Sequence, residues 1–437
     1  MRINSFPSLQ IAVYTRSMIN EVLLQPKKNL TYRILHTADW HLGKLLGDQS
    51  RDEEHILFLD WLIGIIQDHG IDCVVIAGDV FDTASPSNLA QQRYFTFVSR
   101  LFALGTCQLV VTGGNHDSPA QLDAPRNVLK ALNVHVFGGL TDPPENRLVV
   151  LPSVENPRII LGAIPFLRDR DVRTSRSGEQ ADDIRKALVE GIARCYRDTR
   201  DAAGKLNLDC PLVVTGHLTV MGGQACDSER EIHIGGLGSV GPDIFPPECS
   251  AVLLGHLHRP QGWQGKTLVR YSGSPIPLSF SESGDHKSVH VLDIQEDRVD
   301  STLVPIPLFR PLVRMTLSAG QIEQELEDFQ PPEAPLEPWV ELTIQNTPFR
   351  EQMVQEVQSL TETKPYRIMK ILCHSTDQEP RSIPQSYPED LMDKPLDIFL
   401  RVLDKNGITH PQEMEQLTIG FQKVLELIQQ EGGVNEQ

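Results

Sequence analysis

Four short polar motifs, each placed directly after an apolar run, constrain the fold of this 437-residue chain more than any other feature. The runs have the length and the β-branched content of buried strands. In open α/β sheets, ligand-binding groups gather beyond the carboxyl ends of the strands. The pattern therefore predicts an α/β fold with a polar site along one edge of a sheet. In chain order the motifs are Asp39-Trp40-His41, Gly78-Asp79, Gly114-Asn115-His116-Asp117 and Gly255-His256-Leu257-His258.

Apolar runs and helix-length segments alternate through the first two thirds of the chain, which indicates a layered α/β core. Short strands with few helices between them follow, and they indicate a second sheet. We therefore expect an α/β fold in the form of a two-sheet αββα sandwich. The expected strands are residues 32–35, 73–77, 108–111, 158–164, 211–214, 251–254 and 288–294, and the expected helices are residues 55–69, 88–104 and 181–203.

The chain is longer than one core usually supports, so a main domain of roughly 250–300 residues with appendages is expected. Proline-rich breaks near residues 304–311 and 330–338 bracket a β-α-β-α-β unit, with strands at 312–317, 340–344 and 366–372 and helices at 320–329 and 349–360. The expected divisions are an N-terminal extension (1–30), the main domain (31–304), a small α+β cap (305–378), a polar linker (379–390) and a C-terminal helical segment (391–437). Met18 is an alternative start for the chain.

The C-terminal segment carries one apolar stripe at helical spacing. Such a stripe either packs onto its own domain or docks onto a partner, and the sequence supports both readings equally. The stripe consists of Leu417, Phe421, Val424, Leu425 and Ile428.

Cysteine usage and hydropathy indicate a cytoplasmic protein. The seven cysteines are scattered and contain no C-x-x-C pair, which argues for a reducing compartment without a disulfide framework or a structural zinc site. No apolar stretch approaches the roughly 20 residues that span a bilayer, and residues 1–30 lack the apolar core of a signal peptide.

A net charge of −18 is unusual for an enzyme that binds nucleic acid, because lysine and arginine normally neutralise the phosphates. The acidity is concentrated in the last third of the chain. Divalent metal ions would add positive charge where a phosphate has to sit. The main domain also contains Arg168, Arg170, Arg173, Arg176, Arg259 and Arg270.

The first two motifs offer carboxylates and an imidazole for metal binding. Asp39 and His41 are two residues apart, so in extended geometry both side chains reach the same side. A D-x-H pair also occurs by chance as an ordinary turn. Asp79 follows the buried run at 73–77, where an unpaired carboxylate would be costly, and its two oxygens can bridge two ions. Asp82 is expected to cap the following turn or helix, beside the ligands.

The third motif combines a flexible glycine turn with three polar side chains. Asn115 suits metal ligation through its amide oxygen, and His116 suits acid chemistry. Asp117 is assigned with Asp82, close to the ligands without being one of them. A Gly-Asn-His-Asp sequence can be an ordinary loop, but it is much rarer than D-x-H and falls where the sheet needs it.

Three histidines complete the candidate set, each after an apolar run: His217, His256 and His258. A lone histidine is more often a core residue with satisfied hydrogen bonds. Three of them in two Gly-His motifs at strand ends favour metal ligation.

The ordered series D-x-H, G-D, G-N-H-D, G-H and G-H-x-H resembles the calcineurin-like metallophosphoesterase superfamily. Within it, four segments are similar to the SbcD family of exonuclease subunits, and the resemblance covers residues from Thr31 to the C-terminus. The segments are Ile34-Leu-His-Thr-Ala-Asp39-Trp-His-Leu-Gly43, Ala77-Gly-Asp-Val-Phe-Asp-Thr83, Ile164-Pro-Phe-Leu-Arg168 and Tyr271-Ser-Gly-Ser-Pro-Ile-Pro-Leu-Ser-Phe280.

The resemblance implies two divalent ions, most simply Mn²⁺, with Asp79 as their bridge. His116 would then support the leaving oxygen. Some relatives carry a histidine near Asp82, so the resemblance assigns no second catalytic imidazole to this chain. The implied ligands are Asp39, His41, Asp79 and His258 for one ion, and Asp79, Asn115, His217 and His256 for the other.

The resemblance also implies 3′ to 5′ cleavage of double-stranded DNA ends and opening of hairpins, together with an SbcC-type coiled-coil ATPase in a heterotetramer built on a homodimer. Arg168 and the cap would contact DNA, and the C-terminal helices would dock onto the ATPase. Gly265-Lys266-Thr267 is not a P-loop, because Pro260 stands where the motif requires glycine. The alternatives are a phosphoesterase for nucleotides or other small phosphodiesters, and a catalytically silent scaffold, which would have a damaged ligand set.

Overall fold

The computed structural model describes residues 24–28, 31–173, 179–229, 238–296, 298–345 and 350–374, together with Phe399, Leu403, Met414, Leu417, Thr418 and Phe421. The chain divides into two compact units, Met1–His374 and Ser375–Gln437. The sheets and the candidate site belong to the first unit. No helix among these residues is both long enough and apolar enough to cross a membrane.

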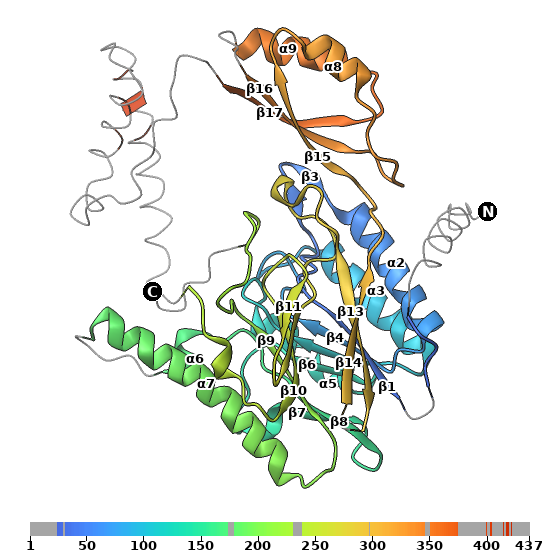
Figure 1. Ribbon diagram of the computed structural model, residues 1–437, viewed down its shortest axis with the longest axis vertical. Helices are drawn as coiled ribbons and strands as arrows, with labels where there is room; N and C mark the ends of the chain where they lie inside the picture. Colours follow the sequence, from blue (N-terminus) through green and yellow to red (C-terminus); the bar gives the residue numbers. More distant parts are fainter. Residues whose placement is uncertain are drawn as a thin grey trace. The chain divides into compact units, whose positions relative to one another are not determined.

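The first of two six-stranded sheets has the order β14-β13-β1-β4-β5-β6 (Figure 1). Its β1, β4, β5 and β6 run parallel, and β13 pairs antiparallel with β1 and with β14. The parallel strands therefore end at one common edge. The strands are β1 (Tyr32–Thr37), β4 (Cys73–Ala77), β5 (Gln108–Thr112), β6 (Val134–Phe137), β13 (Ser288–Gln295) and β14 (Arg298–Pro305).

The second sheet has the order β11-β12-β10-β9-β8-β7. Strands β8, β9, β10 and β12 are parallel, with an antiparallel strand at each edge. The strands are β7 (Leu148–Pro152), β8 (Pro157–Gly162), β9 (Leu212–His217), β10 (Cys249–Gly255), β11 (Gln261–Gln264) and β12 (Leu268–Tyr271).

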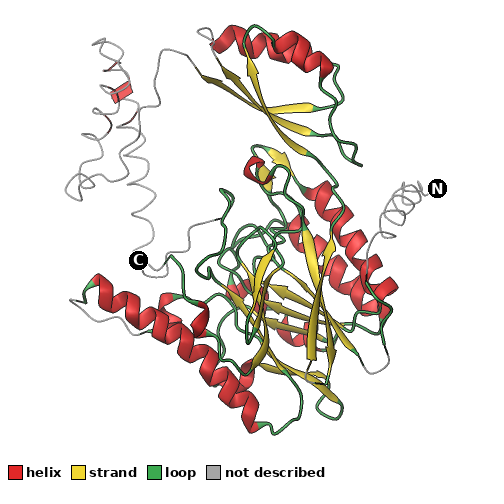
Figure 2. Cartoon of the chain, in the orientation of Figure 1, coloured by secondary structure: helices red, strands yellow, loops and turns green. Residues whose placement is uncertain are grey.

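Helices cover the outer face of each sheet, so the molecule has the expected αββα order (Figure 2). The period-2 alternation of strands explains this arrangement: in β1, Ile34 packs between the sheets and Leu35 packs under the helices. α2 (Asp52–His69) and α3 (Asn88–Leu104) lie on the first sheet, and α7 (Ala181–Lys205) lies on the second. The prediction of a two-sheet αββα sandwich is confirmed.

Local sequence signals set the ends of these helices. The Ser87 hydroxyl accepts a hydrogen bond from the Ala90 N–H at the start of α3. α2 ends at Gly70 and α3 at Gly105, both at positive φ. Short elements fill the connections: β2 (Leu45–Leu46), β3 (Gln49–Ser50), α4 (Pro119–Asp123), α5 (Arg126–Lys130), α6 (Asp169–Val172) and the 3₁₀ turns η1 (Pro144–Arg147), η2 (Pro242–Ile244) and η3 (Phe280–Glu282).

A three-stranded parallel sheet, β15-β16-β17, follows β14, with α8 and α9 in its connections. The β-α-β-α-β order is the predicted one. A small core of its own, with Leu326, Leu342 and Val357, holds this part together. The elements are β15 (Leu312–Ser318), α8 (Ile322–Asp328), β16 (Trp339–Gln345), α9 (Arg350–Thr361) and β17 (Arg367–His374).

Several predictions fall on residues outside those that the structure describes. These are most of the N-terminal extension with Met18, the linker at 379–390, Arg176, and Val424, Leu425 and Ile428 of the apolar stripe. Within the second unit, the rings of Phe399 and Phe421 stack with centroids 4.1 Å apart.

Candidate metal centre

Seven side chains with metal-binding chemistry lie at the carboxyl ends of five strands from both sheets. β1, β4 and β5 lead into the first three motifs, β9 ends at His217, and β10 leads into the fourth motif. The six aspartates and histidines of this set are buried, with at most 4% of their surface exposed. The set, called the ligand cluster below, consists of Asp39, His41, Asp79, Asn115, His217, His256 and His258.

Left-handed backbone conformations aim several of these side chains. Asp39, His41, Asp79 and His256 have φ values of 54°, 47°, 48° and 95°, which residues with side chains rarely adopt. Hydrogen bonds from Asp39 N to Gly78 O and from His41 N to Asp79 O, both 3.0 Å, tie the first two loops together. Backbone strain of this kind persists only where the surrounding structure enforces it, and it concentrates at functional sites.

Two motif glycines permit the close approach of the loops. A Cβ atom at Gly78 would lie 2.1 Å from His217 Nδ1, and one at Gly114 would lie 2.1 Å from Asp79 Oδ1. Both distances are far inside van der Waals contact, so any larger residue would displace a ligand-cluster side chain.

One group of potential ligand atoms comes from Asp39, His41 and His258, and all of them lie within 4.8 Å of one another. A second group, with the same limit, comes from Asp39, Asp79 and His217. Asp79 Oδ2 lies 3.5 Å from His41 Nε2 and 3.4 Å from His217 Nε2, so this carboxylate stands between the two groups.

The remaining two members adjoin the second group. Asn115 Oδ1 lies 2.8 Å from His217 Nε2. The His256 ring packs edge-on against His217, with centroids 5.5 Å apart, and its backbone N–H donates to Asp39 Oδ1 over 2.8 Å. The structure thus brings together all seven residues that the sequence singled out as ligands.

Unsatisfied buried atoms show that the cluster suits cations. Asp39 Oδ2 and His41 Nε2 are buried without a hydrogen-bond partner among the described residues. Buried polar atoms of this kind are costly unless a ligand satisfies them. Imidazole nitrogens together with carboxylate and amide oxygens form a donor set suited to divalent transition metals. The residues present therefore fit metal ions.

Electrostatics within the cluster favour the same interpretation. Burial lowers the pKa of His256 to about 3 and that of His258 well below its ordinary value, so both rings are neutral and can donate a lone pair. Burial opposes the charge of His217, yet the Asp79 carboxylate raises its pKa to about 9. Without a cation, His217 thus compensates the charge of Asp79, and a bound cation would displace that proton.

His116 is held beside the ligand cluster by hydrogen bonds from both its backbone and its ring. Its N–H donates to Asp79 Oδ1 over 2.8 Å, and its ring Nδ1 lies 2.7 Å from the Asp82 carbonyl oxygen. A carbonyl only accepts hydrogen bonds, so Nδ1 must carry the hydrogen. The His116 and His41 rings meet edge-on at 4.6 Å.

Asp117 organises the loops rather than facing the ligand atoms. Its carboxylate accepts from the N–H groups of Val80, Phe81 and Gly114 at 2.9–3.1 Å. It thereby joins the second motif to the third, as expected for a residue next to the ligands.

The expectation that Asp82 caps a turn or helix is wrong. Ser87 caps α3, and the Asp82 carboxylate instead contacts His41 Nδ1 at 3.2 Å and Lys44 Nζ at 3.1 Å. A carboxylate on Nδ1 orients the His41 ring so that Nε2 faces Asp79. His41, Asp82 and His116 also place ligand atoms within 4.8 Å of one another.

Several arginines of the main domain are engaged in local ion pairs. Arg173 pairs with Asp169 and Glu179, and Arg259 pairs with Asp285. Arg270 donates to the backbone carbonyls of Trp263 and Val269. Arg168 is half-buried after β8, and Arg170 is exposed.

Sequence reasoning missed the residues that surround His258. Ser228 and Glu229 contact His258 from the segment between β9 and β10, and Glu282 and Lys287 lie behind them. Single polar residues in irregular segments carry no periodicity or spacing, so no signal in one sequence marks them.

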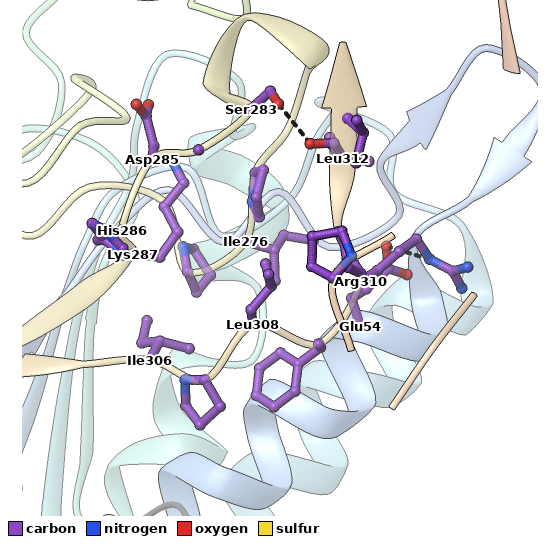
Figure 3. A pocket seen from close by; sticks show the side chains of 18 residues that line it. Glu54, Ile276, Ser283, Asp285, His286, Lys287, Ile306, Leu308, Arg310 and Leu312 are labelled. Atoms are coloured by element: carbon purple, nitrogen blue, oxygen red, sulfur yellow. Dashed lines mark hydrogen bonds and ion pairs between the residues drawn. The ribbon is translucent and has the colours of Figure 1, made fainter. Parts of the chain in front are cut away.

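A separate pocket of about 400 Å³ lies where the chain passes from β14 to β15 (Figure 3). Glu54, Lys287 and Arg310 line it together with apolar residues such as Ile276 and Leu308. No member of the ligand cluster lines this pocket.

Two family models match the chain. The model described as calcineurin-like phosphoesterase matches residues 32–260, and the model described as the Type 5 capsule protein repressor C-terminal domain matches residues 308–406. The first match covers just over half of the chain.

Curated relatives similar to this chain are all named as the D subunit of the nuclease SbcCD. The relative from Escherichia coli (strain K12) is 35% identical over 386 residues, which are 87% of this chain and 95% of that protein. The relative from Rhodobacter capsulatus is 39% identical over 65% of this chain and 71% of its own length. The relative from Bacillus subtilis is 36% identical over 67% of this chain and 74% of its own length.

Proposed function

We propose a function for this chain from the premise that it belongs to the calcineurin-like phosphoesterases and, within them, to the SbcD family of SbcCD nuclease subunits. It is a hydrolase, a metal-dependent nuclease subunit that uses divalent metal ions, with DNA as its substrate and an SbcC subunit as its partner. The finer points below are our proposals.

The observation that carries the metal assignment is the buried convergence of the ligand cluster, with unsatisfied atoms on Asp39 and His41. Asp79, which stands between the two groups of ligand atoms, is the proposed bridge. We propose Mn²⁺ for both ions, because the donor set mixes imidazole with hard oxygen atoms. The proposed ligands are Asp39, His41, Asp79 and His258 for one ion, and Asp79, Asn115, His217 and His256 for the other.

When bound, the ions would supply Lewis-acid activation of the attacking water and of the scissile phosphodiester. The chain itself contributes a charge balance that favours phosphate. The ligand cluster contains only two carboxylates, Asp39 and Asp79, so neutral imidazoles and an amide leave the charge of two divalent ions partly uncompensated. A local positive site can therefore form in a chain whose net charge is −18.

His116 is the proposed catalytic acid. Its Nδ1 hydrogen is committed to the Asp82 carbonyl, so Nε2 is the nitrogen through which the ring would pass a proton to the leaving sugar oxygen. The hydrogen bond from His116 N to Asp79 couples the position of the acid to that of the bridging carboxylate.

For the substrate, we propose 3′ to 5′ degradation of double-stranded DNA ends and opening of hairpins, with Arg168 as a contact to the DNA backbone. An Arg168→Ala variant should bind DNA with a weaker salt dependence, while its hydrolysis of a small phosphodiester stays unchanged. We further propose cytoplasmic location and a heterotetramer of two nuclease and two ATPase subunits.

The test is Mn²⁺-dependent degradation of end-labelled duplex and hairpin DNA, with and without an SbcC-type partner and ATP. Asp79→Asn keeps the size of the side chain and an acceptor for His116 N but removes the bridging charge, so cleavage should fall by about 100-fold or more. Asp300→Asn, on the surface strand β14, is the matched control.

Loss of cleavage in Asp79→Asn alone would support the two-metal nuclease. Turnover of a small phosphodiester without any DNA cleavage would instead favour the nucleotide-phosphoesterase alternative. Absence of both activities in the wild-type complex would favour a silent scaffold.

A further inference from the structure

A chain of buried polar side chains runs from His258 of the ligand cluster to an ion pair behind it. Ser228 Oγ lies 2.7 Å from His258 Nδ1 and 2.6 Å from Glu282 Oε1. Glu282 is fully buried and forms an ion pair with Lys287, of which only 5% is exposed. The cluster combines one loop residue, one residue of η3 and one residue that precedes β13.

The hydrogen count in this chain fixes the direction of each bond. The Glu282 carboxylate, paired with the Lys287 ammonium, accepts hydrogen bonds at both oxygens. Ser228 has a single hydroxyl hydrogen, and it must go to Glu282, because a carboxylate offers none in return. The hydroxyl can then only accept from His258, so His258 Nδ1 carries the hydrogen. Nε2 is left with the lone pair that a metal requires.

Lys287 completes the arrangement without leaving a donor unused. Its three ammonium hydrogens have three acceptors: Glu282 Oε2, the Ser274 hydroxyl at 3.1 Å and the His258 carbonyl at 2.9 Å. A buried charge is tolerated when it is paired and its hydrogen bonds are satisfied. The ion pair is therefore a fixed point to which the serine and the histidine are attached.

The backbone of His258 is held by the same neighbours. Glu229 Oε1 accepts from His258 N over 2.6 Å, and Ser274 N donates to His258 O over 3.1 Å. Partners thus hold the N–H, the carbonyl and Nδ1 of His258. Nε2 is the one polar atom left to face Asp39 and His41, with which it forms a candidate cation site.

We propose that Ser228 and Glu282 are positioning residues, which set the tautomer and the ring orientation of His258 for one of the two metal ions. This inference rests on the proposed two-metal function, which it deepens. Hydrogen-bonding partners behind a ligating histidine typically change metal affinity by about 10- to 100-fold. Only the ion that contacts His258 should be affected.

The variant Ser228→Ala removes the relay and leaves the Glu282–Lys287 ion pair in place, so the fold should persist. Ser228→Thr keeps a hydroxyl and is the rescue variant. Ser279→Ala is the matched control, because Ser279 Oγ also lies 3.5 Å from Glu282 Oε1 but is not hydrogen-bonded to His258.

The measurement is calorimetric titration of the full-length, metal-stripped protein with Mn²⁺, combined with thermal unfolding in EDTA. We expect Ser228→Ala to bind one Mn²⁺ about 10- to 100-fold more weakly and the other with wild-type affinity. Ser228→Thr and Ser279→Ala should match the wild type, and all variants should unfold at the same temperature in EDTA.

Wild-type affinity for both ions in Ser228→Ala would overturn the positioning role while leaving the two-metal function intact. Equal weakening in Ser279→Ala would also overturn it, because it would indicate general loosening around Glu282. A wild-type protein that binds no Mn²⁺ would overturn the two-metal function and this inference with it.

Discussion

His116 occupies a place at the metal centre that its neighbours do not share, because its ring is bound to a backbone carbonyl rather than directed at the carboxylates. The variant His116→Ala should therefore retain Mn²⁺ binding and lose hydrolysis by about 10²- to 10⁴-fold, the usual contribution of a general acid. Calorimetric Mn²⁺ titration and initial cleavage rates on the same preparation separate the two effects.

His286→Ala is a suitable control, since His286 is exposed and lines the separate pocket. Full nuclease activity in His116→Ala would remove the residue from the acid role. Loss of Mn²⁺ binding would make it a ligand instead.

Two other histidines link stability to pH. His36 of β1 and His290 of β13 are opposite each other in the antiparallel ladder, and both are buried. Burial lowers the pKa of His290 to about 4, and burial followed by the proximity of His290 lowers that of His36 further below its ordinary value. Because the folded pKa values are depressed, the unfolded chain binds protons first as the pH falls.

The free energy of unfolding should therefore be unaffected by this pair above pH 6.5 and should fall between pH 6.5 and about 4, where His290 protonates in the folded state. A shift of one unit corresponds to about 1.4 kcal/mol, so His290 accounts for at most roughly 3 kcal/mol of this loss. Urea unfolding of wild type and His290→Gln at pH 7.5, 5.5 and 4.5 tests the prediction. Parallel pH dependence in the two proteins would contradict it.

At the scale of secondary-structure elements, one charge cluster joins helix α2 to the segment that enters β15. Glu54 Oε1 accepts from Arg51 Nε over 2.6 Å and from Arg310 Nε over 2.9 Å. Both guanidinium groups also lie over the Trp339 ring of β16, at 5.4 Å and 4.2 Å. Two buried cations thus share one carboxylate, next to the pocket shown in Figure 3.

Removing that carboxylate should be costly. Glu54→Gln leaves Arg51 and Arg310 as uncompensated buried charges, so the protein should lose about 3–5 kcal/mol of stability. Glu53→Gln is the matched control: Glu53 also accepts from Arg310, but 68% of its side chain is exposed, and the loss should stay below about 1 kcal/mol. Thermal unfolding of both variants provides the comparison, and equal midpoints would refute the role of Glu54.

Element prediction succeeded where the local pattern and the tertiary demand agree. The strand at 73–77 and the helix at 88–104 coincide with β4 and α3, since one is fully buried and the other has a serine cap and a terminal glycine. Strands such as β6 and β12 were missed, because four residues carry too little periodicity to separate a short strand from a loop. Their pairing is decided by neighbours far along the chain.

The same limit applies to the metal centre. Its seven proposed ligands could be predicted, because each belongs to a motif at a strand end. Ser228 and Glu282 could not, since they meet His258 only after the loops fold back over β10. Asp82 was identified near the site but given the wrong partner, because sequence order alone does not distinguish a helix cap from a contact to His41.

At the scale of the whole molecule, the C-terminal stripe offers a test of partner docking. Among its described residues, the Phe421 ring stacks on Phe399, whereas 39% of Leu417 is exposed. The stacked phenylalanines account for self-packing within the second unit, and Leu417 remains available for a partner. We therefore expect both readings of the stripe to hold, each for a different residue.

Leu417→Asp places a charge on the proposed docking face and should weaken binding of an SbcC-type partner by about 10-fold or more, the usual cost at the centre of an apolar interface. Leu206→Asp, at an equally exposed leucine of the first unit, should bind the partner as the wild type does. Surface-immobilised partner and the two full-length variants give the affinities, while Mn²⁺-dependent turnover of a small phosphodiester shows that the metal centre is unchanged. Because the metal centre belongs to the first unit, a variant that lost both partner binding and turnover would refute separate docking and catalytic functions and would favour a second unit that supports the catalytic fold.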